Sequence, residues 1–357
     1  MGGWIQEIRT IACDPNGDER RRFREMRRTA TNLPNSSLGA MKLHVICERD
    51  VGLFSLIQQV IANIAWASRE NRIPIAYFRE RTCYWTPNGY RNKDTVWEYY
   101  FEPLFADYPA DSVPPCVRAI ITQNHPHAQE IGYFADEHTF VSNHFGDHSD
   151  LKGKALFIPY LTEDPSDAVR RAASAIIRDF IRPRPYIHGK VNQFFKEHLE
   201  GHYVIGVHVR GTDAVSEQEV REHRKGSLKL VNYVYEIEAL LKREPDARIF
   251  VATDEQVSLE YLKATFGNRV IAYESIRDQN GMAAGNGPTG WIMPGYICNN
   301  RDRAAQNGEE AVIECLMLAR CNYLVHNGSS LSRTVLLNDP HMPHVNTHWQ
   351  AISGRYL

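Results

Sequence analysis

The sequence alternates short apolar runs with amphipathic segments, and this alternation limits the fold more than any other feature. Lys42 to Cys47 is predicted as a buried strand, Leu53 to Ala67 places its apolar residues on one helical stripe, and Ile73 to Phe78 is a second strand. That order is typical of a parallel sheet covered by helices. No apolar run approaches the roughly 20 residues of a membrane-spanning helix. We therefore expect an α/β protein without a membrane span.

The second half of the chain repeats the alternation more regularly. A helix is predicted from Asp164 as N-cap, with Pro165 at its first position, to Ile181, where Arg-Pro-Arg-Pro interrupts the backbone ladder. Residues 275–308 are rich in Gly and Asn and are predicted as a long loop. Further strands are expected at 203–209, 248–252, 270–273 and 323–325, and helices at 228–241, 259–266, 309–319 and 331–337.

These elements divide the chain into four parts. Residues 1–40 form an Arg-rich N-terminal extension, 41–185 and 186–345 form two Rossmann-like domains, and 346–357 form a C-terminal tail. The boundary between the two domains falls near the prolines at 183 and 185, because a proline breaks a helix and restricts the residue before it.

Charge and cysteine content exclude several classes of partner and site. The chain has 41 Lys and Arg against 43 Asp and Glu, a net charge of −2, which argues against a nucleic-acid partner. The seven cysteines are scattered, with no C-x-x-C and no Cys/His cluster at zinc spacing. No signal-peptide pattern begins the chain. We expect reduced thiols and a cytoplasmic location.

The first candidate site residues follow the strand at 203–209. Alternation places His208 and Arg210 on the same side of that strand, at its carboxyl end, where α/β proteins bind ligands. A guanidinium fork suits phosphate oxygens, and Gly211 allows a close backbone approach. The structural alternative is an Arg210–Asp213 ion pair beside a core histidine.

Two more strand ends carry polar residues. Asp254 follows the strand at 248–252, where it either faces a ligand or caps the next helix. Asn327-Gly328-Ser329-Ser330 precedes a helix whose first amides suit an anion, or it is simply a Ser cap with Gly in the turn. Glu314, in the preceding helix, either accepts from a purine base edge or faces solvent.

A metal-bridged diphosphate has no evident ligands in this chain, since D-x-D is absent. Arg210 and helix-terminus amides would then neutralise the phosphates. We expect no metal at the site.

Three segments together resemble the peptide motifs of the fucosyltransferase superfamily, which includes nodulation-type α1,6-, α1,2- and protein O-fucosyltransferases. They are HVRGTD at 208–213, ATD at 252–254 and ECLMLARCNYLVHNGSSLSR at 314–333. The resemblance covers roughly residues 200–335. It implies a GT-B fold with two facing Rossmann-like domains and parallel sheets. It also implies inverting, metal-independent transfer of L-fucose from GDP-fucose to a glycan hydroxyl, without a cofactor.

The resemblance also assigns roles to residues. Residues 186–345 would bind the nucleotide sugar and residues 41–185 the acceptor. Arg210 would bind the β-phosphate, and His208 would lie against the guanosine. Glu314 stands where the α1,6 enzymes have an Asp that reads guanine. The expected donor-binding residues are His208, Arg210, Gly211, Asp254, Glu314, Ser329, Ser330, Ser332 and Arg333.

The chain departs from the α1,6 pattern H-V-R-R-T-D-K, since Gly211 and Ala214 replace its second Arg and its Lys. The base Glu of that pattern aligns with Gln218. The catalytic base is therefore expected to be Glu217, Glu219 or Asp213, with Arg210 as the other catalytic residue. The acceptor-side loop is expected to include Arg49, Asp50 and Gly52.

Two other functions fit the same residues. The fold could use another nucleotide-sugar donor, or it could bind a nucleotide or carbohydrate without catalysis.

Overall fold

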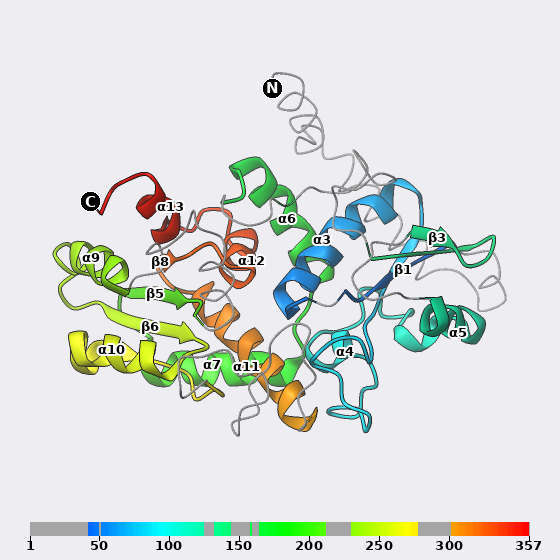
Figure 1. The fold of residues 1–357 in the computed structure, drawn as a ribbon, viewed down its shortest axis with the longest axis horizontal. Coiled ribbons are helices and arrows are strands. Elements are labelled where there is room, and N and C mark those ends of the chain that lie inside the picture. Colours follow the sequence, from blue (N-terminus) through cyan, green and yellow to red (C-terminus); the bar gives the residue numbers. More distant parts are fainter. Residues whose placement is uncertain are drawn as a thin grey trace, which may run out of the picture. The chain divides into compact units, whose positions relative to one another are not determined.

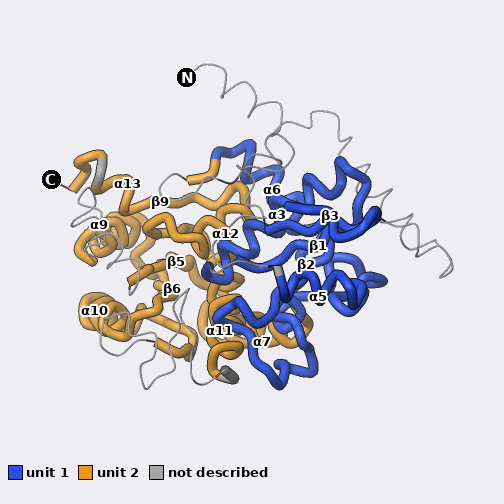
Figure 2. Tube along the Cα trace, turned by 45° about the vertical axis from the view of Figure 1, so that its right-hand side comes forward, with its two compact units in different colours: residues 1–158, 166–183 blue, residues 159–165, 184–357 orange. Residues whose placement is uncertain are grey.

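The computed structural model describes residues 42–49, 51–124, 132–143, 158, 164–211, 230–277 and 301–356. The chain divides into two compact units, each with its own sheet (Figures 1 and 2). Unit 1 comprises Met1–Ile158 and Ser166–Pro183, and unit 2 comprises Pro159–Pro165 and Arg184–Leu357. Both sheets are largely parallel, so the predicted α/β class is confirmed.

The sheet of unit 1 has the strand order β2-β1-β4-β3. Pro74 lies in β2 at the sheet edge, as expected for a residue that donates no backbone hydrogen bond. β1, β2 and β4 are parallel, and β3 pairs antiparallel with β4. The strands are β1 (Leu43–Cys47), β2 (Ile73–Tyr77), β3 (Gly132–Phe134) and β4 (Thr139–Ser142).

The helices of unit 1 include α3, whose residues are buried from Leu53 to Ser68. The predicted start of α6 is wrong: Ser166 is the N-cap, and its hydroxyl accepts from Val169 N–H at 3.4 Å. Asp164 therefore lies outside the helix. The described helices are α3 (Leu53–Arg69), α4 (Val96–Tyr100), α5 (Pro115–Asn124), α6 (Asp167–Phe180) and the 3₁₀ turn Ala110–Ser112.

The sheet of unit 2 is parallel throughout, with the order β7-β6-β5-β8-β9. The chain leaves β5 toward β6 and β7, and later returns to the other side of β5 as β8 and β9. Such a reversal creates the crevice where doubly wound sheets bind ligands. The strands are β5 (Val204–Val209), β6 (Arg248–Thr253), β7 (Val270–Ile271), β8 (Tyr323–His326) and β9 (His344–Asn346).

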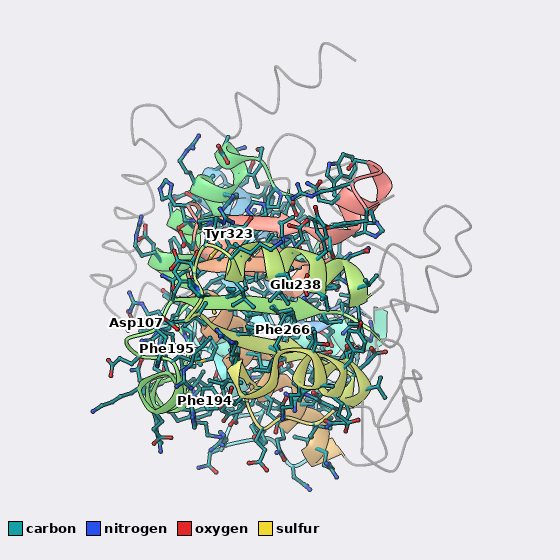
Figure 3. All side chains as sticks on the ribbon, turned by 90° about the vertical axis from the view of Figure 1, so that its left-hand side faces the viewer. Asp107, Phe194, Phe195, Glu238, Phe266 and Tyr323 are labelled. Atoms are coloured by element: carbon teal, nitrogen blue, oxygen red, sulfur yellow. The ribbon has the colours of Figure 1, made fainter. Side chains whose placement is uncertain are left out.

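Register brings the carboxyl ends of the three central strands level. His208 pairs with Ala252 of β6 and with His326 of β8. Apolar residues of the sheet and of the helices packed on it form the core of unit 2, and the partly buried Phe266 and Tyr323 pack against this core (Figure 3). The polar residues that follow β5, β6 and β8 therefore meet at one edge.

The helices of unit 2 correct two predictions. α11 begins at Arg301, so the predicted loop at 275–308 ends earlier than expected, and the predicted tail contains a helix, α13. The helices are α7 (Pro185–His198), α9 (Leu230–Leu241), α10 (Gln256–Phe266), α11 (Arg301–Leu318), α12 (Ser330–Asn338), α13 (Thr347–Ile352) and the 3₁₀ turn Gly267–Arg269.

Within the described ranges, no helix combines the length and apolar character needed to cross a membrane. The five cysteines described, at positions 47, 83, 116, 315 and 321, are free thiols, and all except Cys116 are buried.

Candidate functional site

The end of β5 presents a buried histidine next to a half-exposed arginine. His208 Nδ1 lies 3.1 Å from Ser329 Oγ. Burial, followed by the positive charge of Arg210, lowers the pKa of His208 to about 3. The imidazole is therefore neutral near pH 7, and it positions the Ser329 hydroxyl without adding positive charge.

Arg210 is held by a carboxylate from the neighbouring strand end. Arg210 Nη1 lies 3.1 Å from Asp254 Oδ2, and Gly211 N–H donates to Asp254 Oδ1 at 2.9 Å. The side chain of Arg210 is 30% exposed, so its guanidinium also reaches solvent. Asp254 does not cap α10, whose N-cap residue is Glu255. Asp254 instead ties the end of β6 to the end of β5. The alternative ion pair between Arg210 and Asp213 is not tested, because Asp213 lies outside the described residues.

Gly211 lies directly against the side chain of Glu255. A Cβ atom at this position would collide with the carboxylate of Glu255, which is itself buried and accepts from Ser258 Oγ at 2.7 Å. Any larger residue at 211 would have to displace that carboxylate. The glycine that stands at 211 in place of the second Arg of the α1,6 pattern therefore leaves room for the Glu255 carboxylate.

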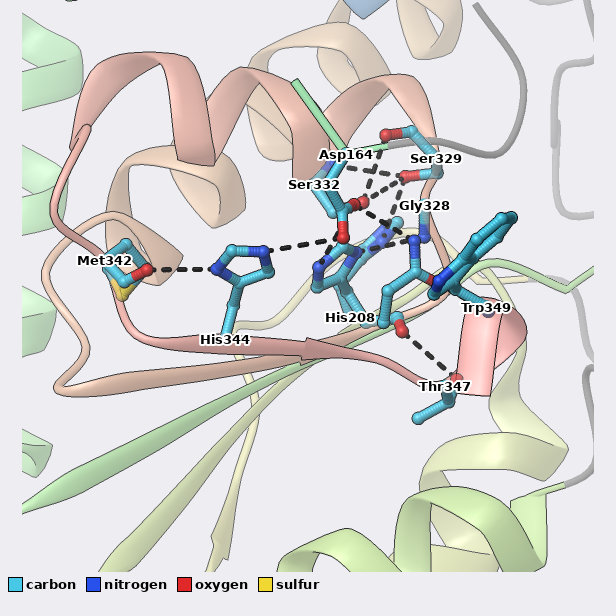
Figure 4. Close-up of polar contacts among 11 residues, drawn as sticks. Asp164, His208, Gly328, Ser329, Ser332, Met342, His344, Thr347 and Trp349 are labelled. Atoms are coloured by element: carbon cyan, nitrogen blue, oxygen red, sulfur yellow. Dashed lines mark hydrogen bonds and ion pairs between the residues drawn. The ribbon is translucent and has the colours of Figure 1, made fainter. Parts of the chain in front are cut away.

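The turn between β8 and α12 is fixed by its own polar residues (Figure 4). Ser329 is the N-cap of α12, and its Oγ accepts from Ser332 N–H at 3.2 Å. Gly328 has a φ of +79°, which favours glycine. Asn327 Nδ2 donates to Arg210 O at 3.1 Å, joining this turn to β5. A Ser cap with Gly in the turn is therefore present, and it lies at a helix start suited to anions.

The remaining loop residues differ in accessibility. Ser330 is half-buried at the first position of α12, whereas Ser332 and Arg333 are buried, with Arg333 only 2% exposed. The donor-binding roles expected for these three residues stay predictions.

Glu314 is buried in α11 and has a cationic partner that the sequence did not reveal. Its Oε1 accepts from Ser275 Oγ at 2.7 Å and from Arg277 Nη2 at 3.2 Å. Burial raises the pKa of Glu314 to about 7, although Arg277 and Ser275 act in the opposite direction. The alternative in which Glu314 faces solvent is wrong. Its contact with a guanine base stays a prediction.

Several predicted residues have no described geometry. The candidate bases Asp213, Glu217 and Glu219 lie outside the described residues, as does Asp50 of the acceptor-side loop. Of that loop, Arg49 Nε donates to Gln59 Oε1 at 2.7 Å, and Gly52 is the N-cap of α3.

Sequence reasoning also missed a cluster below the Ser329 turn. Asp164, predicted as a helix cap, instead lies 3.4 Å from His344 Nε2 and accepts from Asn346 Nδ2 at 3.0 Å (Figure 4). His326 is part of the same cluster. The only sequence signal was the position of His326 at the end of a strand.

The part of the chain that matches a known protein family contains the three strand ends described above. Residues 169–337 match the family model of Nodulation protein Z (NodZ). Nodulation protein Z from Bradyrhizobium diazoefficiens is 26% identical over 149 residues, which cover 41% of this chain and 36% of that protein. Residues 169–337, just under half of the chain, are therefore similar to the NodZ family. The match spans little more than a third of the curated relative's length.

Solved structures of the superfamily resemble the chain at low sequence identity. NodZ α1,6-fucosyltransferase co-crystallised with GDP is 17% identical with a TM-score of 0.49, over 83% of this chain and 92% of that one. POFUT1 in complex with GDP is 13% identical with a TM-score of 0.48, over 85% and 98%. A variant of Arabidopsis thaliana FUT1 in complex with GDP is 12% identical with a TM-score of 0.44, over 96% and 79%.

Proposed function

We propose that the chain is an inverting, metal-independent glycosyltransferase that transfers L-fucose from GDP-fucose to a glycan hydroxyl. One observation carries this proposal. Arg210, its partner Asp254 and the Ser329 helix start meet at the carboxyl edge of one parallel sheet, inside the segment that matches the NodZ family. This edge is where doubly wound sheets bind nucleotides.

The diphosphate would bind between Arg210 and the start of α12. A guanidinium offers paired donors to phosphate oxygens, and the first amides of a helix add further donors and a partial positive charge. Asp254 keeps Arg210 at the strand end before the donor arrives, so less side-chain entropy is lost on binding. Positive charge from these groups would replace a bridging metal ion.

Guanine would be read by Glu314. A carboxylate accepts from the N1–H and amino groups of guanine, and uracil lacks that pair of donors. Arg277 and Ser275 already hold Oε1, so they fix the orientation of the carboxylate. NodZ, whose family model matches residues 169–337, has been co-crystallised with GDP and its crystals soaked with GDP-fucose, which supports this choice of nucleotide.

Transfer would proceed by a single displacement. The acceptor hydroxyl oxygen forms a bond to the anomeric carbon of fucose, and the bond from that carbon to the β-phosphate oxygen breaks, with its electron pair leaving on GDP. The hydroxyl proton passes to a carboxylate, for which Asp213, Glu217 and Glu219 are the candidates. Arg210 would stabilise the charge that develops on the diphosphate, a contribution of roughly 3 kcal/mol for one well-placed donor.

The acceptor would be a glycan bound by unit 1, with the loop containing Arg49, Asp50 and Gly52 as part of that surface. Arg49 is already anchored to α3 through Gln59.

The test is release of GDP from GDP-fucose by the purified chain, with and without EDTA and with candidate glycans. Wild-type protein should turn over the donor equally well with EDTA. Arg210→Ala should lose most activity, whereas Arg243→Ala, which removes an exposed arginine from the turn after α9, should retain it. If the chain binds GDP but turns over no GDP-fucose with any of the glycans tested, the non-catalytic alternative is favoured. A strict requirement for a metal ion would contradict the mechanism.

A further inference from the structure

Asp164, His326 and His344 form a cluster in unit 2 that the proposed chemistry does not use. One ligand-type atom from each residue lies within 4.8 Å of the others. Asp164 Oδ2 is 3.4 Å from His344 Nε2, and Oδ1 is 3.8 Å from His326 Nε2. By residue type alone, such a cluster suits either a divalent cation or a set of shared protons.

Hydrogen bonds on the far sides of the rings distinguish these two possibilities. Gly328 N–H donates to His326 Nδ1 at 3.0 Å, so the neutral ring carries its proton on Nε2, toward Asp164. A cation at Nε2 would have to displace that proton while Nδ1 continued to accept. His344 Nδ1 lies 3.1 Å from Met342 O, so both of its nitrogens face oxygen acceptors. This arrangement favours a proton between Asp164 and His344 at 3.4 Å, whereas His326 Nε2, at 3.8 Å, is too far from Asp164 for a hydrogen bond and interacts with it electrostatically.

Asn346 connects the cluster to the turn before α12. Its Nδ2 donates to Asp164 Oδ1 at 3.0 Å, and its Oδ1 accepts from Trp349 N–H at 3.2 Å (Figure 4). A Cβ atom on Gly328 would lie only 2.9 Å from Asn346 Nδ2. The carboxamide therefore packs directly against Gly328, and Asp164 fixes its orientation.

The same turn sets the direction of the first amides of α12. Gly328 leads into the N-cap Ser329, and Arg333 N–H donates to Ser329 O at 2.9 Å as the helix begins. The first amides of a helix are the groups that bind anions, and here one of them, Ser332 N–H, donates to Ser329 Oγ at 3.2 Å. A shift at Gly328 would move all of them together.

We propose that Asp164 is a positioning residue for the donor diphosphate, acting through His326 and Asn346 on the Gly328–Ser329 turn. This inference rests on the proposed function. Asp164 belongs to the short segment Pro159–Pro165, which lies in unit 2 although the chain on both sides of it belongs to unit 1. The carboxylate thus comes from outside the strand-helix series that builds the rest of the site.

The ionisation of Asp164 agrees with this role. Burial raises the pKa of Asp164. The hydrogen bond with His344 and the neighbouring imidazoles lower it by more than burial raises it, so the pKa lies below its usual range. The carboxylate is therefore charged at pH 7 and accepts from Asn346.

The test compares the affinities of GDP and guanosine by titration calorimetry, because only GDP carries phosphates. In Asp164→Asn the GDP Kd should rise about tenfold, while the guanosine Kd changes less than twofold. Asp164→Glu should restore much of the GDP affinity, since it keeps the charge. Asp246→Asn, which removes an exposed carboxylate beyond α9, should bind both ligands as wild type does.

Gly328→Ala tests the same link from its other end, because the added Cβ meets Asn346 at a positive φ. It should also weaken GDP more than guanosine, which keeps the test decisive if Asp164→Asn does not fold. An unchanged ratio of the two affinities in the folded variants would overturn the proposal, as would stoichiometric Zn²⁺ binding to wild type that His344→Ala abolishes. A wild-type chain that binds no GDP would instead overturn the proposed function.

Discussion

Asp254 holds Arg210 and Gly211 together at the end of β5. Its Oδ2 lies 3.1 Å from Arg210 Nη1, and its Oδ1 accepts from Gly211 N–H at 2.9 Å. One carboxylate from β6 thus fixes both the side chain proposed to bind phosphate and the backbone next to it. The sequence alone suggested either a ligand contact or a helix cap for this residue.

Substitutions of Arg210 and Asp254 should lower turnover by different amounts. Arg210→Ala should lower turnover roughly 100- to 1,000-fold, and Arg210→Lys should recover only part of it, because an ammonium lacks the planar fork. Asp254→Asn keeps an acceptor for Gly211 and loses the ion pair, so it should reduce turnover less than Asp254→Ala. Steady-state kinetics on the donor measures all four. Equal effects of the two Asp254 variants would show that the Gly211 contact is unimportant.

Gly211→Ala should destabilise unit 2 because its Cβ collides with the Glu255 carboxylate. The cost should be about 1–3 kcal/mol, typical of overpacking a filled space. The double variant Gly211→Ala, Glu255→Ala should lose less unfolding free energy than the two single variants lose in sum, because the second change removes the carboxylate that the new Cβ meets. Denaturant unfolding of the four proteins gives this coupling, and strict additivity would show that the collision is relieved elsewhere.

GDP affinity should rise with pH between about 6 and 8. Glu314 has a pKa near 7, and the ionised form is the one that accepts from guanine. Glu314→Gln should lower GDP affinity roughly 10- to 100-fold, as expected for loss of a charged hydrogen-bond partner. It should also flatten the pH profile. The diphosphate titrates identically in both proteins, so the difference between their calorimetric profiles isolates Glu314. If GDP affinity depends on pH in the same way in wild type and in Glu314→Gln, guanine does not bind at Glu314.

Glu48 should make the stability of unit 1 depend on pH. Burial raises the pKa of Glu48 from 4.5 to about 7, against the hydrogen bond from Arg79 N–H. The folded state then holds the proton more tightly than the unfolded chain. Stability should fall as pH rises from about 4.5 to 7 and stay level above, by on the order of 3 kcal/mol in total.

Glu48→Gln should remove this loss and unfold later than wild type at pH 8, with the two proteins similar at pH 4. Glu70→Gln, at an exposed position after α3, is the control. Thermal unfolding across this pH range decides the matter, and a Glu48→Gln variant with the wild-type slope would reject the assignment.

Much of the fold follows from local sequence patterns. β5, β6 and β8 are short apolar runs bounded by polar residues, so their ends at Val209, Thr253 and His326 were predicted to within one residue. The first two turns of α11 were missed because residues 301–308 are mostly polar and include Gly308. α13 was missed because six residues are too few to show helical periodicity.

The site contacts that were missed join residues far apart in the chain. Asp164 meets Asn346 across 182 positions, and Arg277 meets Glu314 across 37. Neither contact can be predicted from the composition of the chain or from the spacing of its residues. Asp164 next to a proline resembles a helix cap locally, and only the tertiary fold gives it histidine partners. Likewise, the sequence shows at Gly211 only the loss of a positive charge, and the tertiary fold places the Glu255 carboxylate beside it.

The central claim is that the chain consumes GDP-fucose, and donor choice tests it most directly. Purified wild-type chain is given GDP-fucose, GDP-mannose or UDP-galactose at equal concentration, and release of the nucleoside diphosphate is followed in EDTA. We predict turnover of GDP-fucose well above the other two, and its loss in Arg210→Ala but not in Arg243→Ala. Preferred turnover of UDP-galactose, or equal turnover of GDP-fucose by wild type and Arg210→Ala, would contradict the account.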